Sequence, residues 1–370
     1  MKNKTNLIFI HKVLKAIADS LIQVFIPLYI LKVSGDINLA FMYLAIHGSM
    51  VIIFNIALKK LLQKFGVICI ILHFIPIIAT EAILSFCQIT LLTIIPCALC
   101  TSLTQTLYSV PLNLIFSFSD KKTNVAKFQI ATNIGKLVFI LVGGFFLSSS
   151  VENSFLILSV VSSFIYVLSV IPIFYAYDML KTSYNSHPTS TVPRTSTDKW
   201  FAVFHMSFGT FQETIDKIVP LFLFVNNLSF QAVTTLLAVN ELIKVGTNYF
   251  AKYLVKSGKE KLSCLISCVV LLCSVVGILF VKNSTILYIL SCLCSFSFPL
   301  TFVPMFKKYC NHLTSTNRQF EGMTERDIEI FSCRPIMHSS CLIFSSFYGP
   351  FAIGMISIIS LFIAEMKLTK

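Results

Sequence analysis

Apolar stretches long enough to cross a membrane recur along almost the whole chain, and only short polar segments separate them. A helix needs about 20 mainly apolar residues to span the hydrocarbon core of a bilayer. These stretches are too long for the strands of an outer-membrane barrel and lack its two-residue alternation. The sequence therefore predicts an all-α membrane protein with about twelve transmembrane helices. The expected spans are residues 7–31, 38–58, 67–87, 90–117, 128–149, 154–176, 200–225, 230–251, 262–281, 285–306, 328–348 and 350–366.

The composition supports lipid as the solvent. Hydrophobic residues make up 56% of the chain and charged residues only 12%, against about 25% charged in a typical soluble domain. A net charge of +13 would suggest nucleic acid in a soluble protein. Here the lysines lie in short loops between apolar runs, so we expect a lipid bilayer as partner and no nucleic acid.

Basic residues are distributed very unevenly over the predicted loops. Alternate loops and both chain ends receive 21 of the 29 Lys and Arg residues, whereas the opposite loops receive only Lys32 and Lys282. Cytoplasmic loops of membrane proteins carry such an excess. We therefore expect both termini in the cytoplasm. The localisation that we expect is the cytoplasmic membrane of a bacterium, with the protein working as a monomer.

The spans divide into two related halves. A polar stretch rich in Ser, Thr and Pro, residues 178–199, reads as a flexible cytoplasmic linker between residues 1–177 and 200–370. One common offset aligns residues 25–30 (FIPLYI) with residues 218–223 (IVPLFL) and places Pro27 on Pro220. Similar motifs in the same order predict an internal duplication, with six helices in each bundle. Six plus six helices in parallel repeats is the layout of one large transporter class.

This layout resembles the major facilitator superfamily over the whole chain. In that family the loop between helices 2 and 3 typically reads Gly-x-Leu-x-Asp-Arg-x-Gly, and residues 59–66 keep the basic residue and the last glycine but carry Gln63 at the position of the aspartate. The resemblance implies a gate loop with a counterpart in the second half. Its candidate residues are Lys60, Lys64, Gly66, Lys252, Lys256 and Gly258.

Ionisable residues within the spans are the candidates for function, because a charge inside a bilayer is costly. In the first span Lys15, Asp19 and Gln23 share one helical face. In the seventh and eighth spans, acids lie three or four residues from a lysine. An acid without a full partner suits reversible protonation. The candidates for proton coupling are Asp19, Glu213, Asp216 and Glu241, and each has the alternative of a purely structural ion pair.

Other polar side chains within the spans are candidates for substrate contacts. Lys136 and Arg334 could bind an anionic group or pair with the acids. The resemblance implies that helices 1, 4, 7 and 10 line a central cavity, which adds residues of the fourth span. The candidates are Gln23, Gln105, Tyr108, Lys136, Arg334 and Asn240.

The predicted function is secondary transport of a small solute by alternating access, coupled to protons, with export slightly favoured over import. The chain has no GxxxxGK[ST] motif for ATP, and its twelve cysteines are scattered, so we expect no enzyme activity, no cofactor and no metal site. Glycines in the fifth span, Gly143 and Gly144, are compatible with export or with close helix packing. The alternatives are a non-transporting receptor or assembly protein of the same fold and a membrane-embedded enzyme that modifies lipid.

Overall fold

The computed structural model describes residues 2–117, 124–149, 153–186, 192–226, 228–281, 283–344 and 346–368. Every regular element within these ranges is helical. The predicted all-α fold class is thereby confirmed. Lys282 and residues 187–191 of the expected linker lie outside the described residues.

Each of the first six predicted spans corresponds to one helix or one broken helix. The first is bent between α1 and α2, and the third is bent between α4 and α5. The elements are α1 (Lys2–Leu21), the 3₁₀ turn η1 (Gln23–Phe25), α2 (Ile26–Ser34), α3 (Ile37–Ala57), α4 (Lys59–Leu72), α5 (Phe74–Phe86), α6 (Leu91–Ser117), α7 (Asn124–Ser148) and α8 (Ser154–Asn185).

The last six spans follow the same rule. Among them, the seventh is interrupted by a π-helical turn and the eleventh is divided at Cys333. The elements are α9 (Ser196–Glu213), the π turn η2 (Thr214–Ile218), α10 (Val219–Val225), α11 (Phe230–Lys256), α12 (Glu260–Phe280), α13 (Ser284–Ser315), α14 (Gln319–Ser332), α15 (Arg334–Phe344) and α16 (Tyr348–Leu368).

Length and apolar composition of the helices alone identify fewer than the twelve spans that the sequence predicts. In the described ranges seven helices are long and apolar enough to cross a membrane, and the number rises to nine if each of two bent pairs counts as one span. The three predicted spans that remain are α9 with α10, α11, and α14 with α15. These are the helices that carry many of the buried charges, so their low hydropathy reflects the polar side chains described below.

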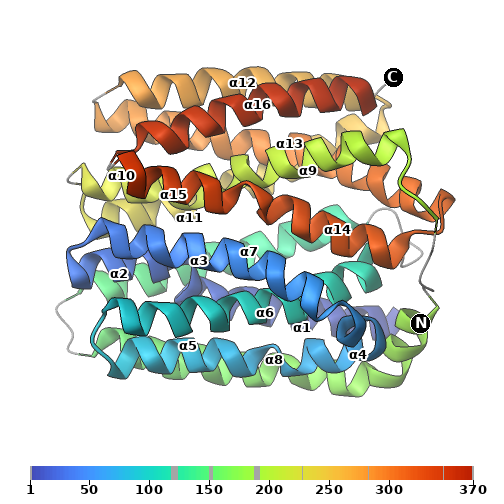
Figure 1. Ribbon diagram of the computed structural model, residues 1–370, viewed down its shortest axis with the longest axis horizontal. Helices are drawn as coiled ribbons and strands as arrows, with labels where there is room; N and C mark the ends of the chain where they lie inside the picture. The colour runs from blue at the N-terminus through green and yellow to red at the C-terminus, as the bar shows by residue number, and fades with distance from the viewer. Residues whose placement is uncertain are drawn as a thin grey trace.

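The helices form two bundles that run side by side (Figure 1). Helices α1–α8 make one bundle and α9–α16 the other, and the two chain termini lie at the same end of the molecule. The bundles meet where α7 packs on α11 and where α3 packs on α14 and α15. At the first contact, a Cβ atom added to Gly144 would lie 2.5 Å from the Cβ of Thr234, so glycine is needed for this close approach.

The first and seventh spans break at equivalent positions. Helix α2 begins at Ile26 and α10 begins at Val219, and these two residues coincide at the offset that aligns Pro27 with Pro220. In both spans proline lies in the first turn of the second helix, a position at which it is common. The matching breaks support the internal duplication that the sequence predicts.

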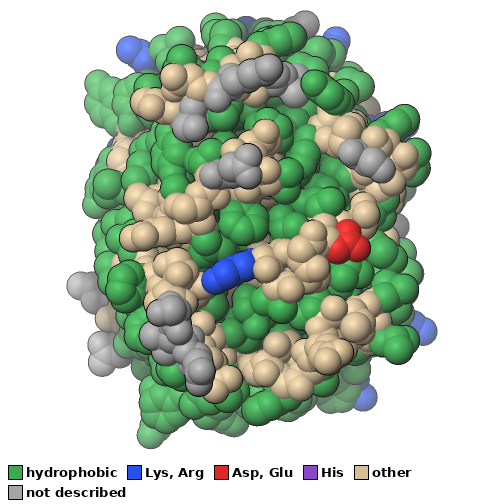
Figure 2. Space-filling view, turned by 90° about the vertical axis from the view of Figure 1, so that its left-hand side faces the viewer, with side chains coloured by type: hydrophobic (Ala, Val, Ile, Leu, Met, Phe, Trp, Pro, Cys, Tyr) green, Lys and Arg blue, Asp and Glu red, His purple; other side chains and the backbone are tan. Residues whose placement is uncertain are grey.

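The end of the molecule that carries both termini, together with Lys59, Lys60 and Lys64 at the start of α4, is here called the basic end. The opposite end is covered mainly by hydrophobic and uncharged polar side chains (Figure 2). Lys32, near the end of α2, and Asp36, the cap of α3, are exposed. Near the basic end α8 continues to Asn185, and α9 starts at Ser196. The helix therefore takes in the first part of the stretch that the sequence suggests as linker.

A close contact between α9 and α14 gives a stability prediction. A Cβ atom added to Gly209 would lie 2.0 Å from the carbonyl oxygen of Ile330, and a backbone atom has little freedom to move away. Gly209→Ala is expected to lower the free energy of unfolding by about 3 kcal/mol, the upper part of the usual overpacking range. Gly246→Ala, with nothing within 4 Å of the added atom, is the matched control and should be neutral or slightly stabilising. Equal melting temperatures of the two variants in detergent would contradict the prediction.

Several ion pairs hold the basic end of the second bundle together. Asp198 caps α9 by accepting hydrogen bonds from the backbone N–H and hydroxyl of Thr195, both at 2.7 Å. Its carboxylate also lies 2.9 Å from Arg318 and 3.0 Å from His312. Arg318 reaches Glu325 as well, at 3.0 Å. The network thus fastens the start of α9 to the end of α13 and the start of α14.

Asp198 precedes the seventh predicted span, and its environment predicts a pH-dependent contribution to stability. Burial raises the pKa of its carboxyl, but the hydrogen bonds from Thr195 and His312 and the charge of Arg318 outweigh burial, so the pKa is lowered below 3.8. The stabilisation is therefore present above the unfolded pKa and is lost as pH falls through the folded one. Asp198→Asn should cost about 1.5–3 kcal/mol at neutral pH. Melting curves of both proteins should converge below pH 3.8, and a constant difference would contradict this.

Candidate functional site

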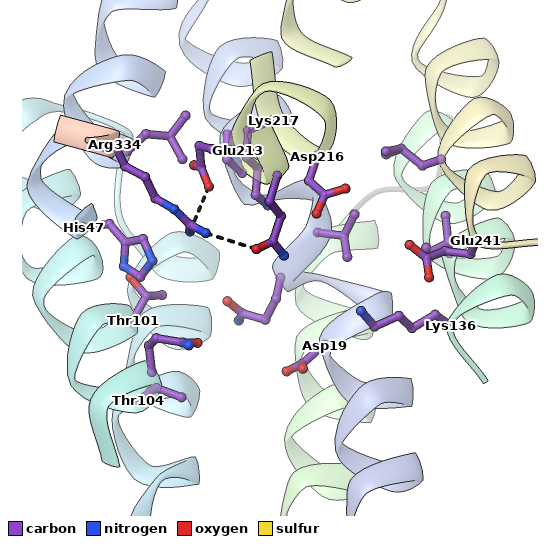
Figure 3. Close-up of a pocket in the computed structure, with 18 of the residues that line it drawn as sticks. Asp19, His47, Thr101, Thr104, Lys136, Glu213, Asp216, Lys217, Glu241 and Arg334 are labelled. Carbon is purple, nitrogen blue, oxygen red and sulfur yellow. Dashed lines mark hydrogen bonds and ion pairs between the residues drawn. The ribbon is translucent and has the colours of Figure 1, made fainter. Parts of the chain in front are cut away.

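A cavity of about 310 Å³ lies between the two bundles. Its lining residues come from α1, η1, α2, α3, α5, α6 and α7 on one side and from α9, η2, α11 and α15 on the other. Ten of these residues are labelled in Figure 3. Nine candidates from the sequence line it, namely Asp19, Gln23, Gln105, Lys136, Glu213, Asp216, Asn240, Glu241 and Arg334.

Two expectations about the lining differ from the structure. Tyr108 is absent from the lining among the described residues: its ring packs inside the first bundle, 4.7 Å from the ring of His73, with the ammonium of Lys15 at 4.4 Å. Helix α13, the tenth span, supplies no lining residue in the described part of the chain. It lies behind α11, where Ser291 accepts a hydrogen bond from Asn240 at 3.2 Å. Helices α7 and α11 take its place in the wall.

Glu213 is the centre of an ion-pair cluster in the second bundle. Its carboxylate lies 2.9 Å from the guanidinium of Arg334 and 3.1 Å from Nε2 of His338. Arg334 also donates a hydrogen bond to the side-chain oxygen of Gln212 at 3.3 Å (Figure 3). Its guanidinium stacks over the ring of Phe331. Both charged side chains are buried, with 6% and 10% of their area exposed. Glu213 is therefore fully engaged by partners from α15.

Asp216 and Glu241 share one cation. The ammonium of Lys244 lies 3.2 Å from Asp216 and 2.8 Å from Glu241. The second carboxylate oxygen of Glu241 is buried and has no hydrogen-bond partner in the described part of the chain. This cluster, here called the Lys244 triad, holds two acids against one lysine. Asp216 is the more accessible of the two acids, with 33% of its side chain exposed.

In the first bundle Asp19 is held on two sides. Lys15 donates hydrogen bonds to both carboxylate oxygens at 2.9 Å and 2.6 Å, and the hydroxyl of Tyr166 donates to the first of them at 2.6 Å. The i,i+4 spacing on α1 predicts the ion pair with Lys15. Tyr166 comes from α8, and nothing in the sequence pattern indicated it.

Glu81, which lacks a partner in its own helix, finds three partners from other helices. It accepts hydrogen bonds from Ser162 at 2.9 Å, from Ser163 at 3.0 Å and from Gln23 at 3.3 Å. Gln23 is therefore partly committed to Glu81, although it also lines the cavity. The arrangement links the cavity wall to α5 and α8.

Three buried polar residues that sequence reasoning missed lie behind Asp19. His11, His73 and Tyr166 are fully buried, and the rings of His11 and His73 lie 5.9 Å apart. Nδ1 of His11 contacts the carbonyl of Ser169 at 2.7 Å. The spacing of His11, Lys15 and Asp19 at four-residue intervals could have identified the first of them as part of the polar face of α1. The other two come from separate helices.

The candidate gate residues lie away from the cavity, at the basic end. A Cβ atom added to Gly66 would lie 2.2 Å from the ring of Tyr184, whose hydroxyl donates to the carbonyl of Leu62 at 2.6 Å. Gly258 has a φ of +69°, which favours glycine. Among the described residues, Lys60, Lys64, Lys252 and Lys256 have no ion pair, and Lys64 lies over the ring of Phe65.

Near the basic end the two bundles touch through α14. Helix α14 packs on α3 and α6, and the hydroxyl of Ser109 donates a hydrogen bond to Asp327. Asp327 is also paired with Arg326 at 3.2 Å. An acidic side chain, Asp327, thus connects the two bundles near the basic end. It comes from the second bundle, whereas the loop of the first bundle carries Gln63 at the position of the family's aspartate.

Solved structures of other proteins match the fold of this chain, whereas comparisons of its sequence found no match. No family model matches the sequence, and no curated protein matches it. A bacterial homologue of the iron transporter ferroportin in an outward-facing state is similar in structure, with a TM-score of 0.73, 11% identity and 99% of each chain covered. The human organic anion transporter MFSD10 has a TM-score of 0.69 at 10% identity, covering 100% of this chain and 99% of its own. The fucose:proton symporter of E. coli has a TM-score of 0.61 at 13% identity, covering 99% and 98%.

These observations define a class: a polytopic helical membrane protein with two six-helix bundles and a polar cavity between them. Within that class, the chain has the fold of these transporters, the fold of the major facilitator superfamily, at sequence identities of only 10–13%. The fold likeness covers the whole chain. The substrate and the energy source are properties of the site and do not follow from the fold.

Proposed function

We propose that this protein is a secondary active transporter that moves a small polar solute by alternating access. The observation that carries the proposal is the cavity, which is lined by ionisable side chains from both bundles. A site at the interface of the two bundles is reached from either side of the membrane when they rock against each other. Charged residues at membrane depth are costly, so their concentration around one cavity favours a solute pathway over a structural role.

The Lys244 triad is the proposed site of proton coupling. With both acids ionised, the triad carries one negative charge in excess, and one bound proton makes it neutral. Asp216, on η2, is accessible from the cavity, and Glu241 lies on α11 beside it. Glu213 is a poorer candidate than the sequence suggests, because Arg334 and His338 both stabilise its ionised form. Asp19 is similarly held by Lys15 and Tyr166.

The proposal includes an orientation but no direction of transport. The basic end is proposed to face the cytoplasm of a bacterial cell, because basic residues favour that side. Gly143 and Gly144 pack against Leu21 and Thr234, so these glycines serve helix packing and do not favour export. A lipid-modifying enzyme fits poorly, because the ionisable residues that line the cavity lie between the bundles, and those at the basic end are paired with one another.

The test uses purified protein reconstituted into liposomes that contain a pH-sensitive dye. After a pH gradient is imposed, panels of sugars, amino acids, amines and organic acids are added outside. A transporter should move protons only when its solute is present and only in liposomes that contain the protein. A receptor of the same fold would bind a solute in a thermal-shift assay and produce neither proton movement nor counterflow, which would overturn the proposal.

A further inference from the structure

The charges that line the cavity do not balance. Five side chains are cationic and four are acidic. Lys15 pairs with Asp19, Arg334 pairs with Glu213, and Lys244 pairs with the two acids of its triad. The cations that remain are Lys136 and Lys217, for which the described part of the chain provides no hydrogen bond or ion pair.

These two lysines belong to different bundles. Lys136 lies on α7 in the first bundle, and Figure 3 shows its side chain directed into the cavity. Lys217 lies on the π turn η2 in the second bundle, next to Asp216 and near Glu213 in the lining of the cavity. A π turn widens the helix by one residue and is frequent at functional sites. It places Asp216 and Lys217 in the lining together with Gln212 and Glu213.

An ammonium group without an ion-pair partner is unfavourable where little water reaches it, and an anionic group that contacts both lysines would supply that partner. We propose that the substrate of the transporter proposed above is a small organic anion, and that its carboxylate-type group binds to Lys136 of one bundle and Lys217 of the other. Such a ligand joins the two bundles electrostatically. Its binding therefore favours the state in which they close around it.

The rest of the cavity fits an organic molecule better than a bare inorganic ion. A volume of about 310 Å³ is at the lower end of the range for small-molecule sites. The wall also presents uncharged polar groups that could bond to hydroxyl or amide groups of the ligand, namely those of Gln105, Asn240, Thr101 and Thr104. A ligand of several heavy atoms with one anionic end and a polar body uses both features.

The test is a thermal-shift titration of purified protein with lactate, succinate, glutamate, glucose, putrescine and sodium chloride. At least one of the three carboxylates should raise the melting temperature, whereas glucose, putrescine and chloride should not. Lys136→Gln and Lys217→Gln should each weaken binding of that carboxylate at least about tenfold. Lys136→Arg and Lys217→Arg should retain most of the affinity, and Lys261→Gln, an exposed lysine near the start of α12, is the matched control.

Two results would overturn the inference. One is stabilisation by none of the carboxylates, or by chloride, glucose or putrescine as strongly as by any carboxylate. The other is unchanged carboxylate affinity in both glutamine variants. The wild-type comparison keeps the test decisive if a variant fails to fold. Carboxylate binding without pH-driven flux would refute the proposed transport alone, and proton-coupled flux of a neutral solute would refute the anion site alone.

Discussion

Replacing Glu213 by glutamine is expected to lower the free energy of unfolding by about 3–5 kcal/mol, because it leaves the buried guanidinium of Arg334 without its counter-charge. The carboxylate lies 2.9 Å from Arg334 and also accepts from His338 at 3.1 Å. Both charged side chains are almost fully removed from solvent. Thermal unfolding of the purified protein in detergent measures the effect.

Two further variants separate the charge from the packing. Glu213→Gln combined with Arg334→Gln should regain part of the loss, because the double variant leaves no uncompensated charge. Glu260→Gln is the matched control: Glu260 pairs with Lys307 at 3.1 Å, but about a third of each side chain is exposed. Such a pair contributes about 0–1 kcal/mol. Equal losses for Glu213→Gln and Glu260→Gln would show that the buried pair contributes no more than a surface pair.

Helix type and helix position could be predicted from the sequence because lipid imposes a length on every span. A run of about twenty apolar residues can be recognised from the local sequence alone, without knowing what packs against it. Helices α3, α6 and α16 therefore lie within a few residues of their expected bounds. The breaks were harder to place. Proline marks the start of α2 and α10, but whether the preceding turn is 3₁₀, as in η1, or π, as in η2, depends on packing from other helices.

The sequence could predict which site residues share a face of one helix, but not which residues of different helices come into contact. Spacing along the first span placed Asp19 and Gln23 on one face, and both line the cavity. Spacing could not show that Arg334, on α15, reaches Glu213 on α9, because that contact joins residues far apart in the chain. Gln105 and Tyr108 are three residues apart on α6, yet only Gln105 reaches the cavity, since His73 and Lys15 cover the ring of Tyr108.

The Glu213 cluster and the Lys244 triad differ in their balance of charge. We therefore expect proton coupling to be lost when the Lys244 triad can no longer bind a proton. In the Glu213 cluster two groups that can carry positive charge face one acid, whereas in the triad one lysine faces Asp216 and Glu241. Asp216→Asn with Glu241→Gln removes both proton acceptors and keeps the approximate shape of both side chains. In liposomes, the stimulation of solute flux by a pH gradient should fall to none, while exchange of labelled for unlabelled solute continues.

Lys244 complicates the double variant, because the amides leave its ammonium without a partner. A triple variant that adds Lys244→Met removes this charge and should fold more stably than the double variant, with the same loss of coupling. Asp36→Asn is the matched control, because Asp36 is an exposed cap of α3 far from the cavity and should keep full coupling. Flux in the triple variant that still responds to the pH gradient would place the proton on another group. The acid nearest to that role would then be Asp19, which binds Lys15 and Tyr166 on the opposite side of the same cavity.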